Sequence, residues 1–186
     1  MPGVVPPRVA LTAVFALAGC ALVVPAFTAD AYAACADSDL QPSAANLEQV
    51  SKSVVCLVNA ERRDRRIPKL KRNSRLNRAA KAHADDMVAK KYFSHQSPSG
   101  AGLADRVRKS GYLRSDDWLL GENLAWATGT LQSPEVVVAA WMNSPSHRRN
   151  ILDRKFKDLG LAATYGVPIN NASDGVTYVN DFGMVR

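Results

Sequence analysis

Apolar residues recur every three or four positions in the first half of the chain, which is the spacing of one buried face of an α-helix. Residues 46–63 carry the first such face, and Pro68 prevents the helix from continuing. A second helix is expected from Ser74, whose hydroxyl can cap the first turn. It includes His83, an imidazole on an apolar stripe that we interpret as a hydrogen-bonded core residue. The apolar positions of the two faces are Leu47, Val50, Val54, Leu57 and Val58, then Leu76, Ala80, Ala84 and Met87.

Two further helices and two strands are predicted downstream. A short helix over residues 102–110 ends at a glycine, and another begins at residues 133–135 (Ser-Pro-Glu), where a capping hydroxyl, a proline and an acidic residue coincide. Near the C-terminus apolar residues alternate, which predicts two strands joined by a turn over residues 170–175. Helices followed by strands, without a repeat or a long linker, indicate a single α+β domain, which we place at residues 46–186.

Residues 1–33 have the pattern of a secretory signal peptide. A single basic residue, Arg8, precedes an apolar run over residues 9–24, and Ala31-Tyr32-Ala33 supplies small residues where a signal peptidase cleaves. We therefore expect export and a mature N-terminal leader over residues 34–45. A membrane-spanning helix is the alternative, but a proline interrupts the run at position 25 and no basic flank follows it.

A second processing route is open at Cys20. Residues 17–20 (Leu-Ala-Gly-Cys) resemble the lipobox of bacterial lipoproteins, in which the cysteine becomes the lipidated first residue. This route would anchor the protein at the cell surface instead of releasing it. The residues that follow Cys20 stay apolar, whereas a lipoprotein usually turns polar there, so secretion is the first expectation.

The cysteines are too few for a four-cysteine zinc site or a disulfide-dense scaffold. Either processing route removes Cys20 from the free thiols, so the exported domain keeps Cys35 and Cys56. An oxidising compartment would favour a disulfide between these two residues. Two free thiols are the alternative.

The chain of 186 residues is 47% hydrophobic and 22% charged, an ordinary globular composition, with a formal net charge of +7. The positive charge is concentrated in residues 61–78, where nine basic residues stand against Glu61 and Asp64. A solvated surface is the simpler interpretation. The functional one is docking to an anionic cell-wall polymer or to lipid headgroups. Nucleic acid is not expected as a partner, because export removes the usual target and no aromatic residues are interleaved.

Three segments place polar, potentially metal-binding side chains outside the periodic stripes, and they contain His95, Glu122 and His147. Two imidazoles and a carboxylate could hold zinc and leave a fourth position open, or could simply hold loops together by hydrogen bonds. Their separations of 27 and 25 residues carry no spacing signal of their own. The sequence lacks the Gly-x-Ser-x-Gly motif of serine hydrolases, so serine hydrolysis is not indicated. It also lacks a Walker motif, so a nucleotide cofactor is not indicated.

These three segments together resemble the CAP superfamily, named for cysteine-rich secretory proteins, antigen-five venom proteins and pathogenesis-related plant proteins, and especially its bacterial secreted branch. The resemblance covers about residues 52–185. Its main motifs are residues 93–98 (Phe-Ser-His-Gln-Ser-Pro), 121–123 (Gly-Glu-Asn) and 144–152 (Ser-Pro-Ser-His-Arg-Arg-Asn-Ile-Leu). Further matches are residues 59–62 (Asn-Ala-Glu-Arg), Trp141 and residues 181–183 (Asp-Phe-Gly).

The resemblance implies a three-layer α–β–α sandwich with a central antiparallel sheet, and a cleft that holds two histidines and two acids. His95, Glu122 and His147 match three of these four positions. The second acid of eukaryotic members falls at Ser144, which we expect to line the cleft together with Asn123. A hydroxyl is a poor substitute for a carboxylate ligand, so any mechanism that needs both acids is in doubt here.

The expected function is extracellular binding by a secreted monomer that holds a divalent metal, zinc above all, at His95, His147 and Glu122. The first alternative is a metal-dependent, peptidase-like hydrolase in which Glu122 is the catalytic base. The second is a structural domain associated with the cell wall. Family membership by itself selects neither a ligand nor a reaction.

Overall fold

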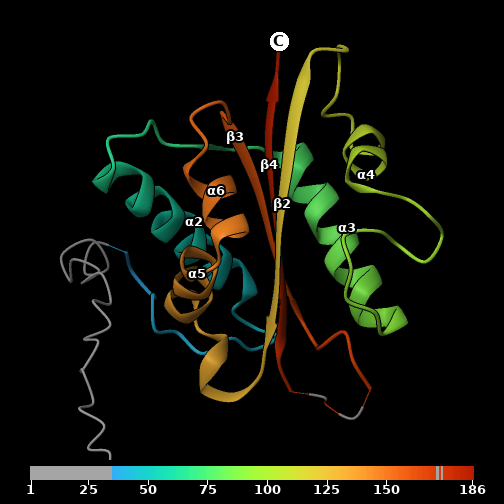
Figure 1. The fold of residues 1–186 in the computed structure, drawn as a ribbon. Helices are drawn as coiled ribbons and strands as arrows, with labels where there is room; N and C mark the ends of the chain where they lie inside the picture. Colours follow the sequence, from blue (N-terminus) through green and yellow to red (C-terminus); the bar gives the residue numbers. More distant parts are fainter. Residues whose placement is uncertain (1–34, 171, 173) are drawn as a thin grey trace, which may run out of the picture.

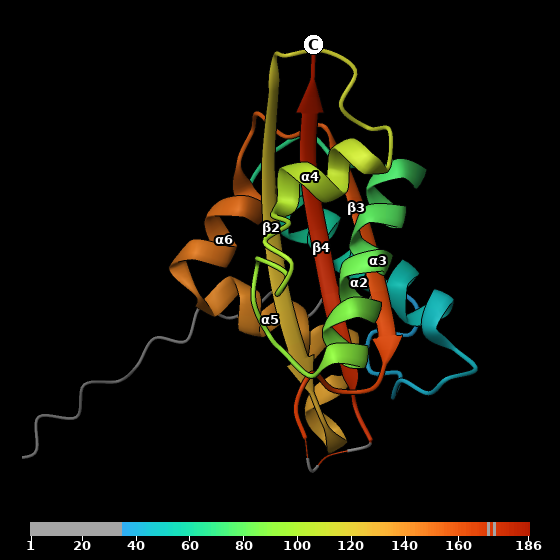
Figure 2. The same cartoon turned by 90° about the vertical axis from the view of Figure 1, so that its right-hand side faces the viewer.

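The computed structural model describes residues 35–170, 172 and 174–186, and it has helices on both faces of a four-stranded sheet (Figure 1). Figure 2 shows the second helical layer from its outer side. This is the single α+β domain that the sequence pattern predicted, arranged as the three-layer α–β–α sandwich that the family resemblance implied. Helices α2 (Leu47–Asp64), α5 (Pro134–Asn143) and α6 (Pro145–Leu152) cover one face, and α3 (Ser74–Lys90) and α4 (Leu103–Lys109) cover the other.

The strands of the sheet follow the order β1-β3-β4-β2, so β2 lies at one edge. The three long strands are antiparallel, as the family resemblance implied. The two-residue strand β1 adds to β3 in parallel, which makes the sheet mixed. The strands are β1 (Lys71–Arg72), β2 (Trp118–Ala127), β3 (Asp158–Tyr165) and β4 (Val176–Val185), and a short 3₁₀ helix, η1 (Gly129–Gln132), follows β2.

Helix α3 approaches the sheet closely because β3 has a glycine, Gly160, where the helix contacts it. A Cβ atom at Gly160 would lie 2.2 Å from the backbone carbonyl carbon of Leu76. On this side the buried face of α3 packs against Leu124 of β2 and Val179 of β4. The predicted stripe of the second helix is therefore correct. The predicted cap is not, since Asn73 and not Ser74 accepts hydrogen bonds from the first free amides of α3.

The opposite layer contains the larger core, in which Trp141, Tyr178 and Phe182 are fully buried. Cys35 and Cys56 form a disulfide with a Cα–Cα distance of 5.7 Å, which confirms the predicted pairing. The predicted signal peptide over residues 1–33 and the predicted alternative lipidation site Cys20 lie outside the described residues. Within the described ranges, no helix is both long and apolar enough to cross a bilayer.

Candidate functional site

The carboxylate of Glu122 is the centre of the candidate site. It points from β2 toward the α3 and α4 layer, and its side chain is only 2% exposed. Oε1 accepts a hydrogen bond from His95 Nδ1 at 2.7 Å, and Oε2 accepts one from Arg106 Nη2 at 2.6 Å. Burial by itself would raise the pKa of Glu122, but the hydrogen bond from His95 and the positive charge of Arg106 outweigh it and lower that pKa. Glu122 is therefore ionised, and each of its carboxylate oxygens accepts a hydrogen bond.

His95 lies in the loop that follows α3 and presents its ring to solvent, with a side chain that is 61% exposed. The hydrogen bond to Glu122 raises the pKa of His95, and partial burial and the positive charge of Arg106 offset this only in part. The bond fixes Nδ1 as the donor. Nε2 has no hydrogen-bond partner among the described residues, so this nitrogen is free to meet a ligand.

His147 is held on the other side of the same strand. Asn123 follows Glu122 on β2, so its side chain points to the opposite face, where Nδ2 donates to the backbone oxygen of His147 at 3.0 Å. Asn150 adds two bonds, from Nδ2 to the backbone oxygen of Glu122 at 3.2 Å and to Asn123 Oδ1 at 2.9 Å. Glu122 and Asn123 are consecutive residues of the edge strand. They thus hold the two segments that contain His95 and His147.

The charge of His95 affects the protonation of His147. Burial lowers the pKa of His147 first, and the positive charge of His95 lowers it further. His147 is therefore the more readily neutral of the two rings. The segments of His95, Glu122 and His147 meet at the β2 edge, but the described residues contain no group of three or more His, Cys, Asp or Glu side chains arranged to hold a metal ion.

Ser144 lies at the junction of α5 and α6, with extended backbone. Its Oγ is 3.2 Å from Ser146 Oγ. In the described part of the chain it makes no hydrogen bond to His95, Glu122 or His147. Asn123, the other residue expected to line the cleft, is fully buried and joins α6 to β2 instead of presenting its amide to solvent.

Two residues of the site were not identified from the sequence. Arg106 of α4 donates through Nη1 to the backbone oxygens of His95 (3.0 Å) and Ala101 (3.2 Å), in addition to its bond with Glu122. Asp181 of β4 pairs directly with Glu122 across the sheet and is completely buried. Burial and the negative charge of Glu122 raise the pKa of Asp181 well above its usual range, so this acid holds a proton.

The sequence offers a signal for each of these two. Arg106 lies three residues after Leu103 on a short helix, on the side that faces the sheet. Asp181 is a charged residue within a strand whose neighbours are all buried. Charges at such positions need a partner or a proton.

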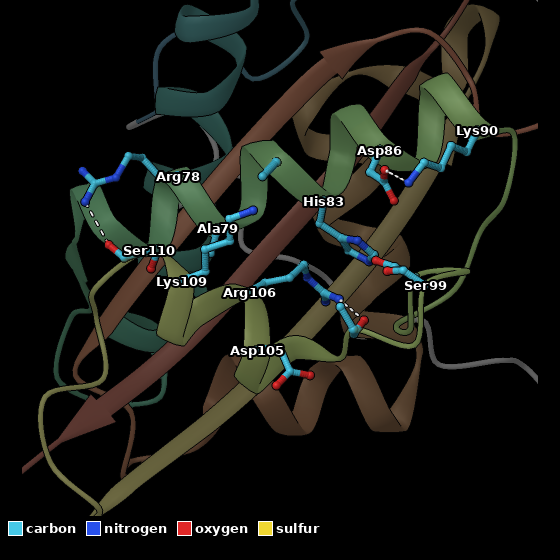
Figure 3. Close-up of a pocket in the computed structure, with 13 residues that line it drawn as sticks. Arg78, Ala79, His83, Asp86, Lys90, Ser99, Asp105, Arg106, Lys109 and Ser110 are labelled. Carbon is cyan, nitrogen blue, oxygen red and sulfur yellow. Dashed lines mark hydrogen bonds and ion pairs between the residues drawn. The ribbon is translucent and has the colours of Figure 1, made fainter.

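A pocket of about 390 Å³ opens between α3 and α4 beside the site. Figure 3 shows His83 and Arg106 pointing into it, with Asp86 and Lys90 paired at one end. His83 is fully buried, and its Nε2 donates to the backbone oxygen of Ser94 at 2.9 Å, as expected of a core histidine. Burial lowers the pKa of His83. This residue connects α3 to the loop that carries His95.

Comparison with known proteins shows which family and structures this chain resembles. The model of the CAP, or cysteine-rich secretory protein, family matches residues 55–179. The uncharacterised protein YkwD of Bacillus subtilis is 40% identical over 110 residues, which are 59% of this chain and 40% of YkwD. This chain therefore matches less than half the length of that relative.

Two solved structures are also similar. An extracellular protein containing an SCP domain from Bacillus anthracis superposes with a TM-score of 0.56 at 28% identity, over 74% of this chain and 40% of the other. An outer surface protein of Borrelia burgdorferi superposes with a TM-score of 0.63 over 75% of this chain and 95% of the other. Its identity of 20% makes the second likeness one of fold alone.

Proposed function

The chain belongs to the cysteine-rich secretory protein (CAP) family, and from this premise we propose that it is an extracellular binding domain whose ligand site is the histidine-lined edge of β2. The observation that carries the proposal is the bond between His95 Nδ1 and Glu122 Oε1 at 2.7 Å. It orients an exposed imidazole so that Nε2 faces outward. An extracellular role is supported by the similar Bacillus anthracis protein, which is named as an extracellular protein.

We propose a divalent metal, zinc in the first instance, as the group that His95 and His147 hold. Metal-binding histidines commonly donate their second ring nitrogen to a carboxylate, and His95 has this arrangement with Glu122. Both Glu122 oxygens are engaged, so we assign Glu122 the role of orienting His95 and not that of a direct ligand. A bound divalent ion would supply a Lewis acid for an anionic or carbonyl group of a ligand.

Binding is better supported than hydrolysis. A general base needs a pKa near the working pH, whereas the pKa of Glu122 is lowered and both of its oxygens already accept hydrogen bonds. Glu122 holds and orients an imidazole, and neither of its oxygens is free to take a proton from water. We therefore retain binding as the proposed function.

Zinc titration by calorimetry at pH 7.5 tests the proposal on the purified protein. We expect His95→Ala and His147→Ala each to weaken zinc binding at least about tenfold, because each removes one imidazole nitrogen. Arg148→Ala is the matched control, since this exposed side chain is next to His147 and should leave binding unchanged. Zinc binding should also weaken on acidification, because a proton on His95 competes with the metal. Equal zinc affinity in all four proteins would refute the metal site.

A further inference from the structure

We propose that a cluster of exposed basic residues at one end of the sheet docks a linear polyanion whose charges are phosphodiester groups. This proposal stands apart from the histidine site and does not depend on it. We call the cluster the basic pole. It consists of Arg63, Arg65, Arg66, Lys69, Lys71, Arg154, Lys155 and Lys157, all of which are exposed.

The fold builds the basic pole from two segments that are far apart in the sequence. The backbone N–H of Lys71 donates to the backbone oxygen of Lys157 at 2.9 Å, in line with the parallel pairing of β1 and β3. Both segments lie at the end of the sheet where β3 begins (Figure 1). The backbones of residues 63–71 and 154–157 therefore lie side by side at this end of the sheet.

The buried side chain of Arg62 holds the same two segments together by hydrogen bonds. It is completely buried, and its guanidinium donates to the backbone oxygens of Pro68 (2.8 Å), Ile151 (2.7 Å) and Asp153 (2.9 Å). One of the nine basic residues counted in the sequence window 61–78 is therefore structural and cannot meet a partner. The three basic residues of 154–157, which lie outside that window, join the surface instead.

Few acidic residues neutralise the basic pole. The two segments contain eight basic residues and one acid, Asp64, which pairs with Arg63 at 3.3 Å. Arg65 pairs with Glu61 at 2.6 Å. Within the described ranges the other six basic residues form no ion pair. Such a one-sided concentration of charge creates a field that attracts polyanions.

The surroundings favour a partner recognised by charge alone. The large hydrophobic side chains exposed elsewhere are Phe93, Trp118, Leu131, Tyr165 and Ile169, and none belongs to the two segments. The apolar residues within them, Ile67, Leu70 and Phe156, are buried. A membrane-binding surface usually adds apolar side chains that insert among lipids, and single-stranded nucleic acid usually stacks on aromatic rings. A flexible phosphodiester polymer without bases requires neither.

Poly(glycerol phosphate) is the probe for this proposal, and its binding is measured by calorimetry over a range of NaCl concentrations. We expect binding that weakens with salt, with a linear dependence of log K on log[NaCl]. The triple variant Lys69→Gln/Lys155→Gln/Lys157→Gln should weaken binding at low salt at least about tenfold and make that slope shallower by about two, since each lost contact removes about 0.7 from the slope for a single-stranded polyanion.

The matched control is Lys90→Gln/Lys91→Gln/Arg108→Gln, which removes the same charge from exposed residues of α4 and of the far end of α3. We expect its affinity and salt slope to stay close to those of the parent protein. Equal losses in the two triple variants would show attraction to net charge only and would overturn the docking surface. Binding to phosphatidylglycerol vesicles without binding to the polymer would overturn it in favour of a membrane partner.

Discussion

At the scale of single residues, Glu122 sets the charge of the site. Its ionised carboxylate lies between His95 and Arg106, and its partner across the sheet is the buried acid Asp181. Two carboxyl groups so close cannot easily both be charged, and the one with hydrogen-bond donors keeps its charge. The proton therefore resides on Asp181, while Glu122 orients His95.

The first prediction concerns the imidazole that Glu122 orients. In Glu122→Gln the amide has no charge, so the pKa of His95 should fall from its raised value toward or below the ordinary value of about 6.5. The measurement is an NMR titration of the imidazole C–H resonances. Glu135→Gln, which removes an acid from α5 on the other side of the sheet, should leave His95 unchanged. An unaltered His95 titration in Glu122→Gln would show that the hydrogen bond does not set its pKa.

A second prediction follows from the proton on Asp181. Because its folded pKa is raised, Asp181 favours the folded state below its unfolded pKa of about 3.9, and this contribution is lost as pH rises through the folded pKa. Asp181→Asn lacks this dependence. We expect its stability relative to the parent protein to increase between pH 4 and pH 8, by at most about 1.4 kcal/mol per pH unit.

Urea unfolding of both proteins at several pH values measures this difference. Asp116→Asn serves as the control, since Asp116 is exposed and its replacement should give no pH-dependent difference. If the stability difference for Asp181→Asn stays constant with pH, Asp181 does not bind a proton more tightly in the folded state.

At the scale of elements, helices with one strongly apolar face could be predicted from the sequence, whereas the two elements that carry Glu122 and His147 could not. Helix α2 was predicted within one residue of its observed bounds because it buries a single stripe. Strand β2 has helices on both faces, so Leu119 and Leu120 are both partly buried and no alternation is visible. Helix α6 begins with a proline, and only Ile151 of its eight residues is fully buried.

The site itself depends on how these elements meet. The contact between His95 and Glu122 spans 27 residues and forms only because the loop after α3 passes beside an edge strand. No local pattern encodes that approach. The family resemblance identified the two residues, but the roles of Arg106 and Asp181 required the three-dimensional arrangement.

The close contact of α3 with β3 gives a prediction at this scale. In Gly160→Ala the new methyl group would overlap the backbone of Leu76, so α3 must move away from the sheet. We expect a loss of about 3 kcal/mol in the free energy of unfolding, measured with urea. Gly102→Ala is the matched control, because its nearest atom would be 3.8 Å away, and it should change stability little. Equal stability of the two variants would contradict the packing described here.

At the scale of the whole molecule, the disulfide joins the start of the described chain to the middle of the first helix. Cys35 is buried against the main core, so the bridge fastens the preceding segment to α2. It closes a loop with a sequence separation of 21 residues. The restriction of the unfolded chain by such a loop contributes about 3 kcal/mol.

The corresponding prediction is that Cys35→Ser/Cys56→Ser loses about 3 kcal/mol of stability, measured by urea unfolding. Reduction of the parent protein should produce the same shift, and reductant should have no effect on the double variant. An unchanged unfolding midpoint after complete reduction would show that the bridge does not stabilise the fold.

The two-residue strand β1 has a consequence for how the molecules behave in a crowded solution. A sheet margin normally exposes backbone amides and carbonyls that can recruit a strand from a neighbouring molecule. Here β1 covers the first two residues of β3 and carries Lys71 and Arg72, both exposed, and β1 itself is too short to template a long ladder. Arg72 is paired with Glu48, but the charge of Lys71 on two approaching copies would oppose their association at this strand, so concentrated samples should resist fibril growth that begins at β1.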